Sequence, residues 1–167
     1  HSFPTRRSSA SQACADEPTA TAMLVTGGAG MGKSRLGYEL VQRLRRRADP
    51  PTLWIGRGDP ISAGSAFNLL AQALRGALGI ADGDPLPARR ARLRARVEQQ
   101  RLPEPERVIT FLGELLGVPL GEDGVQLRAA RRDPVLMGDQ MRRAWEDFLR
   151  AECAAAPVIL ILEDLHW

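Results

Sequence analysis

The feature that most constrains this chain is a glycine-rich octapeptide, GGAGMGKS, that begins at Gly27. It fits the pattern G-x-x-x-x-G-K-[ST] at every fixed position. A short apolar run at residues 22–26 comes before it, and residues 35–44 after it favour a helix. A strand, a glycine loop and a helix in this order are the context in which the pattern cradles phosphate. The sequence therefore predicts a nucleoside triphosphate site; the alternative is a glycine-rich turn with a chance Gly-Lys-Ser.

Each part of this loop has a physical role toward phosphate. Successive backbone N–H groups form an anion-binding concavity, and the helix adds the positive end of its dipole. Glycines allow positive φ and a close approach of backbone to phosphate. We expect Lys33 to contact the β- and γ-phosphates of ATP and the Ser34 hydroxyl to ligate Mg²⁺. The predicted nucleotide-binding residues are Gly27, Gly28, Ala29, Gly30, Met31, Gly32, Lys33, Ser34 and Arg35.

A second motif is an apolar run, residues 157–162, that ends in Glu163 and Asp164. A continuous apolar run is typical of a central parallel strand buried on both faces. Acids at the carboxyl end of such a strand fall where open α/β sheets bind ligands. Strands that end in acids are common, so this Walker B interpretation depends on the phosphate loop upstream. We expect Glu163 to hold Mg²⁺, directly or through water, and Asp164 to orient the attacking water; with Lys33 they are the predicted catalytic residues.

Composition and charge limit the classes of partner that this chain can have. The chain has 167 residues and a formal net charge of only +3, with arginines interleaved with acids. The Arg-rich segment 89–101 therefore favours a solvated helical face over a nucleic-acid contact. No apolar run approaches the ~20 residues that cross a bilayer, so we expect no membrane contact. Cys14 and Cys153 are far apart and lack metal-ligand spacing, which favours a reduced, cytoplasmic setting.

The order of predicted elements defines a fold class. We expect strands at 22–26, at 52–56 and in the apolar run before Glu163, and a helix from the loop to about residue 47. Further helices are predicted at 65–78, 88–101, 106–116 and 134–155, with loops at 80–87 and 117–132. Alternating strands and helices predict a parallel sheet with right-handed crossovers. The expectation is an α/β, three-layer P-loop NTPase fold that is truncated after the Walker B strand.

Two segments need a separate interpretation. The last predicted helix starts with Asp133 as N-cap and carries an apolar stripe, for which a core face is favoured over a metal or cofactor site. This stripe consists of Met137, Met141, Ala144, Trp145, Phe148 and Cys153. Residues 1–20 are polar and expected to be disordered, and residues 1–9 match the translation of a short-read sequencing adapter. We therefore expect residues 21–167 to be the N-terminal part of a P-loop ATPase domain.

The segments GGAGMGKSRL, LWIGRGDP and ILILEDLHW together resemble the AAA-type, STAND-like ATPase module of bacterial signalling proteins. That module occurs in LuxR-type transcriptional regulators, in Ser/Thr kinases with a C-terminal ATPase region and in cyclase-linked regulators. The resemblance implies that Gly27, Gly32, Lys33 and Ser34 form the nucleotide loop and that Glu163 and Asp164 are the Walker B acids. Where the general pattern has Asp, this chain has Glu163. The family's sensor residue and arginine elements would lie beyond the end of this sequence.

Three functions remain open at this point. The resemblance implies a regulatory ATPase switch that controls effector domains of the same chain, with assembly into a homo-oligomer left open. The alternatives are a metabolic P-loop enzyme, such as a small-molecule kinase, and a nucleotide-dependent scaffold that hydrolyses little. The long helical insertion before the Walker B strand and the ending Glu-Asp-Leu-His-Trp favour the switch.

Overall fold

The computed structural model describes residues 20–58, 67–121 and 124–165. The predicted disordered tail, Cys14, and the His-Trp pair at the end of the chain lie outside these ranges, apart from residue 20. The described residues divide into two compact units, His1–Pro51 and Thr52–Trp167, and each is described by itself.

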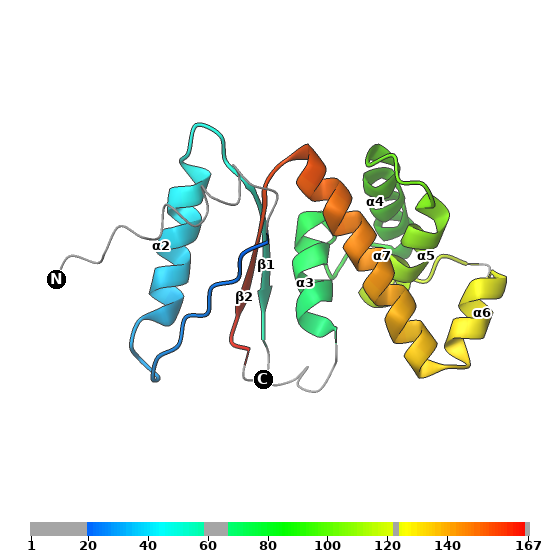
Figure 1. Cartoon of the computed structure of the whole chain (residues 1–167), viewed down its shortest axis with the longest axis horizontal. Coiled ribbons are helices and arrows are strands. Elements are labelled where there is room, and N and C mark those ends of the chain that lie inside the picture. The colour runs from blue at the N-terminus through cyan, green and yellow to red at the C-terminus, as the bar shows by residue number, and fades with distance from the viewer. Residues whose placement is uncertain (1–19, 59–66, 122–123, 166–167) are drawn as a thin grey trace. The chain divides into compact units, whose positions relative to one another are not determined.

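Within the described residues of the first unit, helix α2 (Lys33–Arg45) begins directly after the glycine loop (Figure 1). Arg43 and Arg45 lie in its last turn, where cations favour the helix dipole. The predicted strand at 22–26 is wrong, because residues 20–28 adopt no regular secondary structure. A strand is held by hydrogen bonds to a neighbouring strand, and the described residues give this segment none. The side chains of Met23, Leu24 and Val25 are accordingly exposed, by 58%, 75% and 42%.

The second unit contains a parallel pair of strands, β1 (Thr52–Arg57) and β2 (Val158–Glu163). Their register runs from Thr52 opposite Val158 to Arg57 opposite Glu163. The predicted parallel pairing is confirmed, but the sheet of the described residues has two strands where three were expected. Every residue of β2 is half-buried rather than fully buried, because the strand has one neighbour there and not two.

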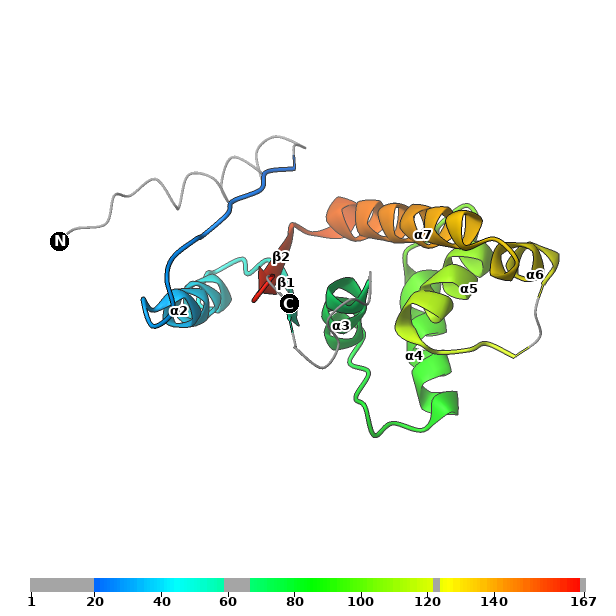
Figure 2. The same cartoon turned by 90° about the horizontal axis from the view of Figure 1, so that it is seen from below.

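In the described residues, five helices lie between the two strands. They are α3 (Asn68–Ala77), α4 (Leu86–Gln99), α5 (Pro105–Leu116), α6 (Val125–Arg131) and α7 (Pro134–Ala155). In both views α3 stands between the strands and the pair α4–α5 (Figures 1 and 2). The predicted loop at 117–132 is wrong in its second half, where α6 buries Leu127 and Ala130. This helix has only seven residues, too few for its apolar period to stand out from the glycines before it.

Aromatic packing joins the sheet to the helices. The Trp54 ring of β1 is fully buried, with its centroid 5.4 Å from that of Trp145 and 5.9 Å from that of Phe148, both on α7. Gly56 lets α3 approach closely, since a Cβ at this position would lie 2.5 Å from the Leu69 carbonyl oxygen. The strands and helices of the second unit therefore share one core.

Helix α7 begins and packs largely as predicted. The Asp133 carboxylate accepts hydrogen bonds from the N–H groups of Val135 (2.9 Å) and Leu136 (3.2 Å), which confirms the N-cap. In the predicted stripe, Ala144, Trp145 and Phe148 are buried, and the two methionines pack against the core. The assignment of Cys153 to this stripe is wrong, because Cys153 is exposed. The core-facing position is Glu152, four residues after Phe148 on the same side of the helix.

Glu152 is a buried charge that links α7 to α4. Its side chain is 3% exposed, and its carboxylate accepts hydrogen bonds from Arg96 (2.6 Å) and from the Gln100 amide. A carboxylate at this depth is tolerated only while these partners remain, since burial of an unpaired charge is costly. The pair therefore couples two helices that are far apart in the sequence.

We predict that Arg96→Ala destabilises the protein by about 3 kcal/mol, because it leaves the Glu152 charge buried with one neutral partner. Arg142→Ala is the matched control: its pairs with Asp139 and Glu146 are solvent-exposed, so their loss should cost much less stability than loss of the Arg96 pair. Urea denaturation of the variants measures both values. Equal losses for the two variants would show that Glu152 is not held as a buried ion pair.

Candidate functional site

The glycine loop has left-handed backbone at two of its four glycines. Gly30 (φ 75°) and Gly32 (φ 82°) both lie in the left-handed region, which costs other residues energy. Gly27 and Gly28 are under no such constraint, since a Cβ there would meet its nearest atoms at 3.7 Å and 3.6 Å, in ordinary contact. The local backbone therefore requires glycine at positions 30 and 32 but not at positions 27 and 28.

The start of α2 offers unpaired donors to an anion. Its N-cap is Gly32, which supplies no side-chain cap, and the first turn holds no acidic residue. The first N–H groups of a helix have no intrahelical partner, and no side chain among the described residues caps this end of α2. The helix ladder starts with the Leu36 N–H donating to the Gly32 carbonyl at 2.9 Å. This end of the helix is therefore suited to phosphate, and Ser34 lies within it.

The Lys33 ammonium folds back over the loop. Its Nζ donates hydrogen bonds to the carbonyl oxygens of Gly27 and Gly28, both at 2.8 Å. An ammonium has three N–H donors, so one remains for a ligand while two hold the loop closed. Lys33 thus has a structural role in the loop in addition to the predicted phosphate contact. A substitution of Lys33 would remove both.

The other predicted loop residues are exposed. Met31 is 76% exposed. Arg35 donates to the carboxylate of Glu39 one turn further along α2, with Nε at 3.0 Å and Nη2 at 2.9 Å. A nucleotide contact by Arg35 stays a prediction, and it would compete with this exposed pair.

The Walker B residues lie at the end of β2 and just after it. Glu163 is its last residue, and Asp164 follows with a φ of 56°, a left-handed conformation that aspartate tolerates better than most residues. The Gly58 N–H donates to the Glu163 carbonyl at 2.8 Å. A Cβ on Gly58 would overlap the Asp164 carbonyl oxygen, so only glycine allows the two chain segments this close.

Arg57 is a functional-site candidate that sequence reasoning missed. It lies opposite Glu163 in the strand register, and its Nε (3.0 Å) and Nη2 (2.6 Å) both donate to Glu163 Oε2. This hydrogen bond and the Glu163 charge raise the pKa of Arg57 above its ordinary value, so the guanidinium stays charged. The segment LWIGRGDP contained the residue, but only the register between two distant strands shows its partner.

The predicted site residues form two groups in the structure. The loop residues 27–35 belong to the first unit, and Glu163 and Asp164, with Arg57, belong to the second. That the two groups meet around one nucleotide stays a prediction. The described residues contain no cluster of three or more His, Cys, Asp or Glu. Hydroxyl and carboxylate oxygens together with phosphate are nevertheless the ligands that Mg²⁺ takes in nucleotide sites, and Ser34, Glu163 and Asp164 fit that chemistry.

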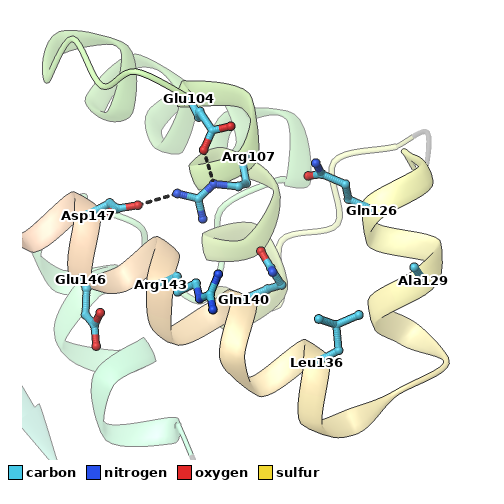
Figure 3. A pocket seen from close by; sticks show the side chains of 9 residues that line it. All are labelled: Glu104, Arg107, Gln126, Ala129, Leu136, Gln140, Arg143, Glu146 and Asp147. Atoms are coloured by element: carbon cyan, nitrogen blue, oxygen red, sulfur yellow. Dashed lines mark hydrogen bonds and ion pairs between the residues drawn. The ribbon is translucent and has the colours of Figure 1, made fainter.

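The helical part of the second unit holds a separate cavity of about 500 Å³ between α5, α6 and α7 (Figure 3). Arg107 lies on its wall and donates to Glu104 (3.0 Å) and Asp147 (2.5 Å). Arg143 pairs with Asp139 at 2.9 Å. Most charged groups at this cavity thus have partners within the protein, although Arg107 Nη1 is buried and has no hydrogen-bond partner among the described residues. The cavity is a weaker candidate for a ligand site than the loop.

We predict that Gly58→Ala destabilises the protein by about 1–3 kcal/mol, because the new methyl group must displace the Asp164 backbone. Gly76→Ala is the control: its Cβ meets open space on a helix, where alanine should stabilise by up to about 1 kcal/mol. Urea denaturation compares the two. A Gly58→Ala variant as stable as the parent would contradict the close approach.

None of the helices in the described ranges is both long and apolar enough to span a bilayer. Comparison with known proteins agrees with the loop geometry. The family model for the AAA ATPase domain matches residues 9–167. An uncharacterized protein of Rhizobium meliloti (strain 1021) is 30% identical over 145 residues, which are 87% of this chain and 13% of that protein. The chain thus spans a small part of the relative's length. No solved structure matches the chain significantly.

Proposed function

Because the chain belongs to the AAA ATPase domain family, we propose that it is the ATP- and Mg²⁺-binding part of a regulatory switch in a larger bacterial signalling protein. Nucleotide binding and ATPase activity follow from the family; the regulatory role is the proposal. The observation that supports nucleotide binding is the loop itself. Gly30 and Gly32 have left-handed backbone, α2 starts without a side-chain cap, and Lys33 Nζ donates to two loop carbonyls.

The proposed roles follow from the chemistry of each group. The N–H groups of residues 27–34 and the Lys33 ammonium hold the phosphates, and the Ser34 hydroxyl holds the metal ion. Mg²⁺, when bound, neutralises charge on the phosphates. Asp164 orients the attacking water, and Glu163 holds Mg²⁺, directly or through water. The fold proposed for the intact domain is the three-layer P-loop NTPase fold.

The switch is favoured over a metabolic enzyme by the architecture between the two strands. The structure describes five helices between β1 and β2, and their buried residues form one core with the sheet. The 167 residues cover only 13% of the relative's length, so the effector domains are proposed to lie in other parts of the full-length protein. The site of action is proposed to be the cytoplasm, and assembly of several copies is left open.

A direct nucleic-acid contact is not proposed, because the arginines of α4 already have partners. Arg90 donates to the Pro119 carbonyl, Arg92 to the Gly79 carbonyl and to Asp84, and Arg94 to Glu106. Arg96 is held by Glu152. A basic face that binds phosphodiester backbones would need these cations free.

The full-length protein tests this proposal. Incubation with Mg-ATP should release inorganic phosphate, and addition of candidate phosphoryl acceptors should leave the products unchanged. Small-angle scattering of the ATP- and ADP-bound forms should differ if nucleotide state rearranges the effector domains. Phosphoryl transfer to a small molecule would instead establish a kinase, and tight nucleotide binding without turnover or rearrangement would favour a scaffold.

A further inference from the structure

The cavity between α5, α6 and α7 is lined almost wholly by polar side chains. Its volume is about 500 Å³, which lies in the range of sites that hold small molecules. Of the nine described residues that line it, only Ala129 and Leu136 are apolar. All three helices belong to the second unit, so the cavity is formed within one compact body. It is therefore suited to a small polar molecule and not to an apolar one.

One face of α7 forms one side of the cavity. Leu136, Gln140, Arg143 and Asp147 recur at intervals of three or four residues, which places them on the same side of the helix. Figure 3 shows Gln140 and Arg143 extending from α7 toward α5, while Arg107 extends from α5 toward α7. The cavity is thus lined by guanidinium groups from two helices.

Arg107 has a buried donor without an acceptor. Its side chain is 16% exposed, and its Nε and Nη2 donate to Glu104 (3.0 Å) and Asp147 (2.5 Å). The third nitrogen, Nη1, is buried and has no hydrogen-bond partner among the described residues. A charged donor rarely stays buried without an acceptor, because leaving it unpaired costs free energy. Nη1 therefore offers a place for an acceptor oxygen of a bound molecule.

Two side chains of α7 at the cavity also have donors that the described part of the chain leaves unpaired. Arg143 pairs with Asp139 through Nε at 2.9 Å, and its two terminal nitrogens make no hydrogen bond there. The Gln140 amide makes none either. The Arg143 side chain is 59% exposed, so it can shift without disturbing the core. Such a shift at the cavity is what admits a ligand to Arg107 Nη1, which is covered in this structure.

The charges at the cavity limit the class of ligand. The lining contains two arginines and three acids, Glu104, Glu146 and Asp147. A multiply charged anion would be repelled by these carboxylates, and a cation alone would leave Arg107 Nη1 without an acceptor. Among the described residues, Glu104 Oε1 and Glu146 Oε2 accept no hydrogen bond. A molecule with one carboxylate and one ammonium group meets both requirements.

We propose that this cavity binds a small zwitterion of the amino acid class. The ligand carboxylate accepts charge-assisted hydrogen bonds from Arg107 Nη1 and from the terminal nitrogens of Arg143, and the ligand ammonium donates to Glu104 or Glu146. The Gln140 amide, which can both donate and accept, orients the ligand between them. The site shares no residue with the glycine loop or the Walker B acids, so the proposal does not depend on nucleotide binding.

The test titrates the nucleotide-free, full-length protein with each standard L-amino acid by isothermal calorimetry. At least one of them should bind with a dissociation constant below about 1 mM. The amide of that amino acid lacks the carboxylate charge and should bind about 10-fold more weakly or worse, because hydrogen bonds between arginine and carboxylate are among the strong ones. Inorganic phosphate serves as a plain anion and should not compete.

Arg143→Met and Arg142→Met are a matched pair of variants on α7. The two arginines are adjacent and similarly exposed, at 59% and 53%, but Arg143 lines the cavity and Arg142 does not. Arg143→Met should weaken amino acid binding about 10-fold or more, while Arg142→Met should leave it within about twofold. Arg107→Lys keeps the charge and loses Nη1, so it should also weaken binding about 10-fold.

Several results would overturn the proposal. It fails if no standard L-amino acid binds below about 1 mM, if the amide binds as tightly as the acid, or if Arg143→Met and Arg142→Met bind alike. Competition by phosphate that Arg143→Met abolishes would establish a plain anion site instead. Should Arg107→Lys not fold, Arg143→Met decides, since it changes an exposed side chain. Titration of the same samples with Mg-ATP tests nucleotide binding separately, so failure of either conclusion leaves the other standing.

Discussion

Replacing Lys33 with alanine should weaken Mg-ATP binding by the full protein about 100-fold or more, because a charge-assisted contact to the terminal phosphates is lost. The structure adds a second reason. Lys33 Nζ also holds the carbonyl oxygens of Gly27 and Gly28, so its removal loosens the loop that should receive the phosphates. Isothermal titration with Mg-ATP measures the change.

The control for this experiment is Arg43→Ala, a cation in the last turn of the same helix. It removes the same charge from α2 without touching the loop, and nucleotide affinity should stay within about twofold, as screening of a distant exposed charge predicts. An unchanged affinity of the Lys33→Ala variant would refute the assignment of GGAGMGKS as a phosphate-binding loop.

Asp164→Asn should lower kcat about 100-fold or more while the dissociation constant of Mg-ATP changes little, because a group that orients the attacking water acts mainly in the transition state. Glu163→Gln should have a smaller effect on kcat and should raise the Mg²⁺ concentration needed for nucleotide binding, since an anionic oxygen is replaced by a neutral amide. Steady-state turnover, with titration of Mg²⁺ at fixed ATP, separates the two variants.

The opposite result for the two variants would exchange the roles of Glu163 and Asp164. If Glu163→Gln abolishes turnover with Mg²⁺ dependence intact, and Asp164→Asn leaves kcat near the parent, Glu163 is the residue that orients water. The Arg57 contact would then position the catalytic carboxylate itself, because both donors meet Glu163 Oε2.

Local chemistry made much of this fold predictable. The start of α7 follows from Asp133 and Pro134, and α4 and α5 are separated by the prolines at 103 and 105, so their bounds lie within a few residues of those expected. The loop motif was recognisable because its glycines, lysine and serine are close together in the sequence. The apolar run before Glu163 predicted a strand, and its parallel partner at 52–57 is confirmed.

The errors share a cause, since each depends on residues distant in the sequence. The run at 22–26 has a strand's composition, but a strand needs backbone partners. Cys153 was assigned to the core because cysteine is apolar. Glu152 takes that place because Arg96 on α4 and Gln100, the C-cap of α4, satisfy its charge. Short α6 is stabilised by burial of Leu127 and Ala130, and this burial cannot be predicted from the local sequence pattern.

The sequence by itself determined the glycine-loop motif, the pair of acids and the AAA ATPase family, because these depend on the identity and spacing of adjacent residues. Only the tertiary structure decided what those residues contact. It showed that Lys33 closes its own loop, that Gly30 and Gly32 need positive φ while Gly27 and Gly28 do not, and that Arg57 faces Glu163 across a register joining residues 106 positions apart. Register is set by packing of whole strands and helices, and so it cannot be inferred from either strand alone.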